Sequence, residues 1–354
     1  DASDPVPILR QKLIDELCSS DDQLQVGLPG DRRLTVVPQL SPITAAPVRT
    51  VQRDWVCLLT GGARGITAEI AKLLAQRSQP VLILAGASPL PSGDESSDTA
   101  GVEDGPALKA ALMKRLRAQG GSVKPAEVEA AYQRLLKNRQ IHQTLRTLRD
   151  LGSRVEYHAV DVRNEAAFAG LLEDIYARHG RLDVMVHGAG IIEDKLLRDK
   201  TPASFDNVLL TKADSAFVLS RKLRADSLRC LLFMSSISAM FGNRGQADYS
   251  AANGILNGLA VSLAARWPGR VVAMNWGPWD QSGMVSEETR QQFLSRGIQV
   301  IPPAEGAEAA LREIECGPRE EVLVGLGGGP WLDGAQSLSA AAAVGSLHML
   351  GSAG

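Results

Sequence analysis

The feature that most constrains this chain is a regular alternation, from residue 56 onward, of short apolar runs with segments of helical periodicity. The apolar runs are rich in Val, Ile and Leu, as are strands that are buried on both faces of a parallel sheet. They are residues 56–60, 81–87, 154–162, 182–190, 230–234 and 270–276. Six strands joined through helices predict a doubly wound, parallel α/β sheet of Rossmann type.

The composition excludes several classes of protein. Of the 354 residues, 44% are hydrophobic and 22% are charged, which is typical of a soluble globular protein. The net charge of −2 gives no basis for binding nucleic acid or an anionic membrane. No apolar run is long enough to span a bilayer, and the first residues lack the pattern of a secretory signal. The four cysteines lie far apart without a CxxC motif, so we expect a reducing, cytoplasmic location and no metal site.

Changes in composition divide the chain into three parts. Residues 1–52 form a lead-in, with a helix candidate at 8–16 and a strand-like segment at 24–40 that turns at Gly-Asp. Residues 53–330 are the main domain, which carries a helical insertion at 107–150 with a break at 120–125. Residues 331–354 are dominated by small side chains and are expected to be a C-terminal linker tail.

A glycine-rich turn follows the first strand and opens the first helix. Glycines at 61, 62 and 65 would allow backbone amides at a helix N-terminus to approach a pyrophosphate, which predicts a dinucleotide site. Thr67 stands where the usual fingerprint has its last glycine, so we expect altered helix–strand packing. Asp161 and Val162 end the third strand and would flank the adenine. The cofactor-binding candidates in the turn are Thr60, Gly61, Gly62, Arg64, Gly65 and Ile66, and those that end the fourth strand and would line the cofactor's floor are His187, Gly188, Ala189 and Gly190.

An alternative without a cofactor and the type of cofactor both stay open at this site. The glycines after the fourth strand would also suit a close helix crossing without any cofactor. The end of the second strand, residues 85–88, carries neither a cation for a 2′-phosphate nor an acid for a free ribose hydroxyl. Arg64 is therefore the candidate for a 2′-phosphate.

A serine and a tyrosine suggest the chemistry. Ser236 is expected at the end of the fifth strand, and Tyr249, thirteen residues later, opens an Ala-rich helix. A tyrosine on the first turn of a helix, facing a serine at a strand end, can donate a proton to a carbonyl oxygen that the serine holds. This arrangement suits reduction of a ketone, although an ordinary core strand and helix would also explain the pattern.

Six motifs in this order, TGGARGI, VDV, VHGAG, MSSIS, GNRGQADYSAAN and NWGPW, resemble the ketoreductase (KR) domain of modular and iterative type I polyketide synthases. These domains are members of the short-chain dehydrogenase/reductase superfamily. The resemblance covers residues 53–330, and residues 20–42 look like a remnant of the structural subdomain that precedes such reductases. The helical insertion and the segments HGAGIIEDKLL and WGPWDQSGMVSEE are most similar to reductases of polyunsaturated fatty acid synthases and related iterative synthases.

The resemblance implies roles for single residues. Tyr249 would be the general acid and Ser236 its partner on the substrate carbonyl. Asn253 stands where stand-alone reductases have a lysine, and Lys212 on the preceding helix would supply that lysine; otherwise Lys212 is an exposed surface residue. The implied reaction is transfer of hydride from NADPH to a 3-ketoacyl thioester on an acyl carrier protein, beside neighbouring synthase domains.

The resemblance also implies a product configuration. Asp194 matches the last residue of a Leu-Asp-Asp motif that accompanies D-alcohol products, and Phe241 stands where the other class has a tryptophan. Both favour the D (3R) alcohol. Residues 276–297 resemble a mobile lid, whose Phe293 and Leu294 would touch an acyl chain or serve as packing. Gln246, Trp276 and Met284 complete the substrate and stereocontrol candidates.

One departure from the family keeps other functions open. Ala87 replaces an arginine that usually meets the NADPH 2′-phosphate, so we expect a weakened NADPH preference. The alternatives are a catalytically silent structural or cofactor-binding domain, which Thr67 and Ala87 leave possible, and a stand-alone short-chain dehydrogenase for a small alcohol, against which Asn253 argues.

Overall fold

The six predicted strands all form, and they lie in one sheet. The computed structural model describes residues 4–20, 25–36, 38–41, 46–90, 95–119, 123–280, 287–330 and 346–349. Seven parallel strands have the order β6–β5–β4–β7–β8–β9–β10, and β11 and β3 extend the sheet antiparallel beyond β10. Their bounds are β4 Val56–Thr60, β5 Val81–Gly86, β6 Val155–Ala159, β7 Val184–His187, β8 Cys230–Ser236, β9 Arg270–Trp276, β10 Leu323–Leu326, β11 Ser346–Met349 and β3 Pro38–Ser41. The predicted doubly wound Rossmann-type fold is confirmed.

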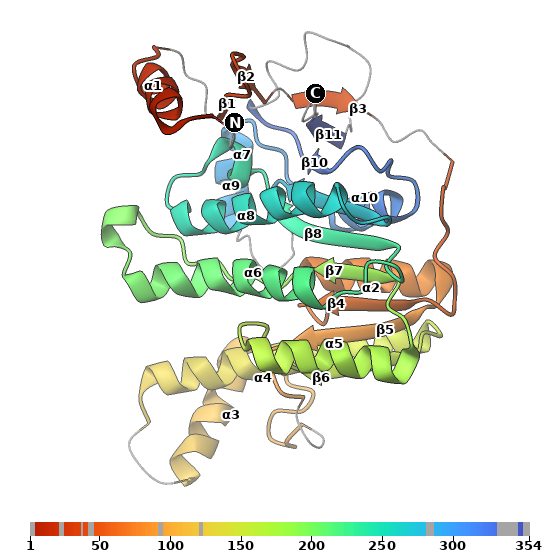
Figure 1. Ribbon diagram of the computed structural model, residues 1–354. Helices are drawn as coiled ribbons and strands as arrows, with labels where there is room; N and C mark the ends of the chain where they lie inside the picture. Colours follow the sequence, from red (N-terminus) through yellow and green to blue (C-terminus); the bar gives the residue numbers. More distant parts are fainter. Residues whose placement is uncertain are drawn as a thin grey trace.

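Helices cover both faces of this sheet (Figure 1). On β4, Cys57 and Leu59 pack into one core, and Val56 and Leu58 pack into the other, because successive strand residues point to opposite faces. The first core lies under α2 Gly65–Ser78, α4 Pro125–Asp150 and α10 Pro303–Glu315, and the second under α5 Glu165–His179, α6 Pro202–Lys222 and α8 Ala247–Ala264. Burial on both faces explains why the strands read as continuous apolar runs.

The strand order fixes where a ligand can bind. The chain leaves β4 toward β5 and β6 and then returns to β7 on the other side of β4. At such a reversal the loops after two neighbouring strands diverge, which opens a crevice at their carboxyl ends. The glycine-rich turn after β4 and residues 188–190 after β7 border this crevice.

The lead-in contains the predicted helix and turn. Helix α1 spans Val6–Leu17, and β1 Val26–Gly27 pairs with β2 Leu34–Thr35 around a turn in which Gly30 has a φ of 51°. The insertion forms α3 Gly105–Ala118 and α4, with the predicted break between them. Figure 1 shows α3 at the opposite end of the molecule from α1.

Two strands were not predicted. β10 follows α10 and is short, with Gly325 in its interior, so its sequence signal is weak. β11 lies within residues 331–354, which the sequence predicts to be a linker tail, and at Ser346–Met349 the chain forms a strand by backbone pairing with β10 and β3. The remaining elements are the short helices η1 Leu197–Asp199 and α7 Ser238–Phe241 and the helix α9 Glu287–Ser295.

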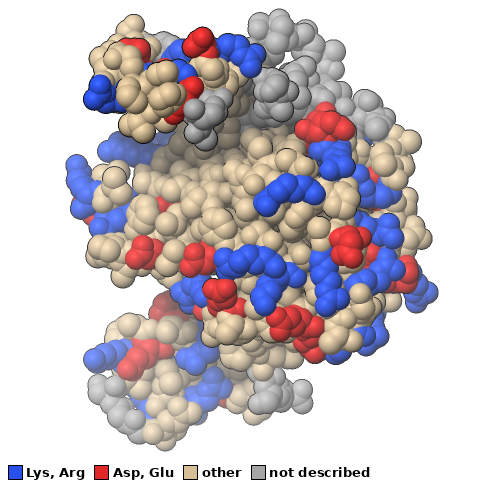
Figure 2. All heavy atoms as spheres, viewed as in Figure 1, with Lys and Arg blue, Asp and Glu red and all other residues tan. Residues whose placement is uncertain are grey.

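The surface and the helices agree with the composition. On the face shown in Figure 2, basic and acidic side chains are interspersed. No helix in the described ranges is both long enough and apolar enough to cross a membrane.

The packing of α10 against the segment after β9 generates a stability prediction. A Cβ at Gly306 would lie 2.3 Å from the buried ring of Trp279, whose neighbour Trp276 limits its movement. We expect Gly306→Ala to lower the free energy of unfolding by about 1–2 kcal/mol, because the overpacking outweighs the gain in helix propensity. Gly170 on α5 faces open space, so Gly170→Ala should raise that free energy by about 0.5–1 kcal/mol. Urea denaturation measures both changes, and a stabilised Gly306→Ala variant would contradict the packing argument.

Candidate active site

The loops after β4 and β7 contact each other at their first residues, at the carboxyl edge of the sheet. Gly61 has a φ of 73°, and a Cβ there would lie 3.2 Å from the carbonyl oxygen of Gly188. The buried Thr60 hydroxyl accepts hydrogen bonds from the amides of Gly188 at 3.1 Å and Ala189 at 3.2 Å. Thr60, predicted to bind the cofactor, therefore uses its hydroxyl to hold the second loop onto the first.

His187 lies beneath this contact. Its Nδ1 is 3.0 Å from the Thr60 hydroxyl, and its Nε2 is 3.1 Å from the Ser215 hydroxyl on α6. Thr60 already accepts two amide hydrogens, so it donates its own hydrogen to Nδ1, which assigns the imidazole proton to Nε2. Burial, together with the nearby Lys212 ammonium, lowers the pKa of His187 to about 3. A neutral His187 supports the floor of the crevice from behind.

Thr67 has a partner that accommodates it. A Cβ at Gly188 would lie 2.1 Å from the Thr67 methyl group, so glycine at 188 provides the space that the threonine fills. The usual arrangement puts the small residue on the helix, whereas here it lies on the facing loop. Helix α2 and the loop after β7 therefore still approach closely.

The start of α2 leaves room for an anion. The N-cap residue Arg64 is extended, and no side chain caps the helix. Amides of the first turn therefore have no side-chain cap, which is also the case in helices whose N-termini bind phosphate. Burial raises the pKa of Tyr157 on β6, and the charge of the Arg64 guanidinium opposes this rise. Among the described residues no acid pairs with Arg64, whereas Asp161 is bound by Arg163 at 2.6 Å, which lowers the pKa of Asp161. Val162 beside it is buried.

Tyr249 and Lys212 lie together between α6 and α8. Tyr249 is half-buried in the first turn of α8, and the Lys212 Nζ is 5.6 Å from the centroid of its ring. Only 4% of Lys212 is exposed, so the alternative of a surface lysine was wrong. Its ammonium donates to the Met234 carbonyl oxygen at 2.6 Å, and burial lowers its pKa to about 8. Burial raises the pKa of Tyr249, so its hydroxyl keeps its proton at neutral pH.

Asn253 and the end of β8 complete this group. The Asn253 Nδ2 donates to the Tyr249 carbonyl oxygen at 2.8 Å, and its backbone carbonyl oxygen accepts from the Ser235 hydroxyl at 3.3 Å. Its buried Oδ1 has no partner in the described part of the chain, so it is free to accept a hydrogen bond. Ser236 is half-buried at the carboxyl end of β8, where its hydroxyl accepts from the Ser238 amide at 3.2 Å.

The substrate candidates lie in different surroundings. Asp194 is exposed in the loop after β7 and accepts from the Gln246 amide at 3.0 Å, which ties that loop to the start of α8. Phe241 is half-buried at the end of α7. The Trp276 ring is buried in the core against Trp279, with centroids 5.0 Å apart, so its side chain serves packing. Met284 lies outside the described residues.

The sequence interpretation missed two charged residues beside Tyr249. The Lys200 ammonium and the Asp248 carboxylate form an ion pair of 2.6 Å, with their side chains 2% and 1% exposed. The available signal was an acid directly before Tyr249 at the start of an otherwise apolar helix.

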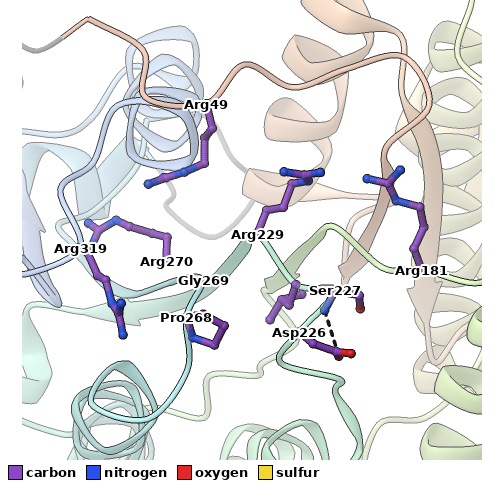
Figure 3. Close-up of a pocket in the computed structure, with 10 residues that line it drawn as sticks. Arg49, Arg181, Asp226, Ser227, Arg229, Pro268, Gly269, Arg270 and Arg319 are labelled. Atoms are coloured by element: carbon purple, nitrogen blue, oxygen red, sulfur yellow. Dashed lines mark hydrogen bonds between the residues drawn. The ribbon is translucent and has the colours of Figure 1, made fainter.

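A second hollow lies at the other end of the strands (Figure 3). It measures about 530 Å³ and lies at the amino ends of β7, β8 and β9, away from the crevice. Its arginines have internal partners: Arg181 and Arg229 bind Asp183, Arg270 binds Glu313, and Arg49 and Arg319 donate to the carbonyl oxygens of Ile314 and Trp267. These contacts stabilise the amino ends of the strands, and the candidate site is therefore the crevice.

Known proteins share both the sequence pattern and the fold. Residues 56–281, more than half of the chain, match the model of the KR domain family. One subunit of the polyunsaturated fatty acid synthase of Thraustochytrium sp. is 29% identical over 88% of this chain and 11% of its own length. Polyketide synthase PksN of Bacillus subtilis is 26% identical over 78% of this chain and 4% of its own length.

Solved structures agree. A ketoreductase domain from the bacillaene assembly line superposes with a TM-score of 0.65 at 26% identity, over 87% of this chain and 64% of that one. A C2-type ketoreductase from a modular polyketide synthase shares the fold, with a TM-score of 0.67 at 20% identity over 96% of this chain and 62% of that one. The chain spans about a tenth or less of the length of the curated relatives. With this fold, this crevice and this match, the chain belongs to the KR domain family and is a ketoreductase domain like those of polyketide and polyunsaturated fatty acid synthases.

Proposed function

We propose that this domain reduces the 3-keto group of acyl-carrier-protein-tethered 3-ketoacyl thioesters with NADPH, within a polyketide or polyunsaturated fatty acid synthase. The observation that carries the proposal is the placement of a protonated Tyr249 beside the buried Lys212 ammonium, at the carboxyl edge of the sheet. The membership of its relatives in multidomain synthases supports the carrier-protein partner and the neighbouring domains.

The residues around the crevice fit a dinucleotide phosphate. The uncapped start of α2 and the close approach at Gly61 leave backbone amides for a pyrophosphate, and Arg64 is the nearby cation for a 2′-phosphate. A short-chain dehydrogenase of Burkholderia cenocepacia, which shares the fold at a TM-score of 0.56 and 19% identity, was solved in complex with NADP. The proposed cofactor is therefore NADPH, which supplies the hydride when bound.

The side chains of the site would handle the proton and the oxygen charge. Ser236 donates a hydrogen bond to the ketone oxygen, and Tyr249 donates its proton as negative charge develops there. The Lys212 ammonium stabilises the tyrosinate that results, because opposite charges attract strongly in a poorly hydrated site. Asn253 holds the first turn of α8 through the Tyr249 carbonyl and so keeps the acid in place.

We propose the D (3R) alcohol as the product. The support is Asp194, which the Gln246 amide holds next to the start of α8, and Phe241 in place of a tryptophan. Chiral analysis of the alcohol from a short 3-ketoacyl thioester reports the configuration, and an L product would contradict this assignment.

The role of Tyr249 is tested with trans-1-decalone as the ketone. We expect the protein to oxidise NADPH in its presence and Tyr249→Phe to lower kcat about 100-fold or more, because the proton donor is lost while the ring packing is kept. Absorbance at 340 nm follows the reaction. Turnover that survives in Tyr249→Phe would exclude Tyr249 as the acid. If the wild-type protein binds NADPH but reduces neither trans-1-decalone nor the short 3-ketoacyl thioester, a silent domain is favoured instead.

The low pKa of Lys212 predicts the pH dependence. Its pKa is about 8, so the ammonium predominates below that pH and is lost as the pH rises through it. Because the cation promotes proton donation, we expect kcat/KM for reduction to fall about tenfold per pH unit above pH 8. Lys212→Met should be slow throughout and lack this decline. A wild-type profile that stays flat up to pH 9.5 would show that the ammonium is not required.

The cofactor preference depends on Arg64. With Ala87 at the end of β5, Arg64 is the single cation that we assign to the 2′-phosphate, so Arg64→Ala should raise the KM for NADPH about tenfold or more. The KM for NADH should stay unchanged, since NADH lacks that phosphate. Arg77→Ala, at the exposed end of the same helix, is the matched control. Equal increases for both cofactors would show that Arg64 does not read the phosphate.

A further inference from the structure

A buried ion pair lies directly against the residue that we assign as the acid. The Asp248 Oδ2 accepts from the Lys200 Nζ at 2.6 Å, and the Asp248 Oδ1 accepts from the Tyr249 amide at 2.9 Å. The Lys200 Nζ also donates to the Glu193 carbonyl oxygen at 2.6 Å. Both oxygens of Asp248 therefore have partners, and the ammonium links Asp248 to the loop after β7.

The loop after β7 is also hydrogen-bonded to α6 and to the residues at the start of α8. The Glu193 carboxylate accepts from the Ser204 hydroxyl at 2.6 Å and the Asn207 amide at 2.7 Å, both on α6. The Lys195 amide donates to the Gly245 carbonyl oxygen at 3.0 Å, and Gln246 holds Asp194. The loop with the stereocontrol candidate is thus fastened to α6 and to the first turn of α8, and Lys200 lies where these three segments meet.

The charges need an explanation other than stability. Removing two ions from water costs so much that apolar residues of similar volume often give an equally stable or more stable protein. An ion pair does, however, fix distance and direction more strictly than apolar contact, and this one fixes the amide of Tyr249 itself. A reaction that needs a proton donor at one side of a carbonyl depends on such placement.

We propose that Lys200 and Asp248 are positioning residues that lock the loop of residues 191–200 against the first turn of α8. They thereby fix the Tyr249 hydroxyl and the side from which the ketone is presented. This inference rests on the proposed reduction. The pair would act on the rate and on the configuration of the product, but not on cofactor binding, because its contacts are with the loop and the tyrosine.

The experiment compares two equally buried ion pairs. Lys200→Met/Asp248→Asn removes the charges near the site and leaves no unpaired ion, and the amide introduced by Asp248→Asn retains an oxygen for the Tyr249 amide. Arg270→Met/Glu313→Gln does the same to the pair at the opposite end of the strands, which is also 2.6 Å long and almost fully buried. For each we measure kcat, the KM for NADPH, the melting temperature and the ratio of the two alcohols from a short 3-ketoacyl thioester. Lys200→Arg is the conservative variant.

We expect the Lys200/Asp248 double variant to lose about 10–100-fold in kcat, with the KM for NADPH changed less than about threefold and the ratio of alcohols shifted toward a mixture. The Arg270/Glu313 variant should keep both kcat and the ratio, whatever its melting temperature, and Lys200→Arg should restore most of the ratio.

Three results would overturn the proposal. The first is an unchanged kcat and an unchanged ratio of alcohols in a folded Lys200/Asp248 variant. The second is an equal shift of the ratio of alcohols in the Arg270/Glu313 variant. The third is a Lys200/Asp248 variant that does not fold, together with a Lys200→Arg variant that folds, keeps the wild-type kcat and changes only the KM for NADPH. If the wild-type protein itself reduces no ketone, the proposed reduction fails, whereas wild-type turnover with an unchanged rate and ratio in the folded Lys200/Asp248 variant overturns this inference alone.

Discussion

In a parallel sheet that is buried on both faces, the carboxyl ends of the parallel strands lie at the same edge. The site of this protein depends on that constraint. Because helices cover each face, neither face can hold a ligand, and only the loops at the strand ends remain. The reversal of strand order between β4 and β7 then selects one place along that edge. Residues from β4, β7 and β8 and from α6 and α8, far apart in the sequence, meet there.

Buried polar groups keep this edge rigid. Thr60, His187 and Ser215 form a continuous chain of hydrogen bonds from the glycine-rich turn to α6. Lys212 is anchored on the carbonyl oxygen of Met234, and Asn253 holds the Tyr249 carbonyl. Each buried donor would be costly if it were left without a partner, so any shift of one loop disturbs the others. The Asn253 Oδ1, which is buried without a partner among the described residues, is an exception.

Much of the fold could be predicted because its signals are local. The apolar runs of β4 to β9 and the glycines of the first turn each mark their own element, and their order along the chain indicates the topology. β10 was missed since a four-residue strand with a glycine has little signal, and β11 because its strand character comes from pairing with β10 and β3. Thr67 suggested disturbed packing, but the compensating space lies at Gly188, more than a hundred residues away.

The sequence by itself determined the fold class, the glycine-rich turn and the candidates Ser236 and Tyr249, because each depends on residue type and spacing, and the resemblance to the KR domain family added the candidates Lys212 and Asn253. Only the tertiary structure decided that Lys212 is buried beside Tyr249, that the Thr60 hydroxyl serves the protein itself and that Trp276 belongs to the core. It alone joined Lys200 to Asp248. Burial and ion pairing are properties of neighbours in space, and a sequence pattern carries no information on neighbours that the fold brings together from distant segments.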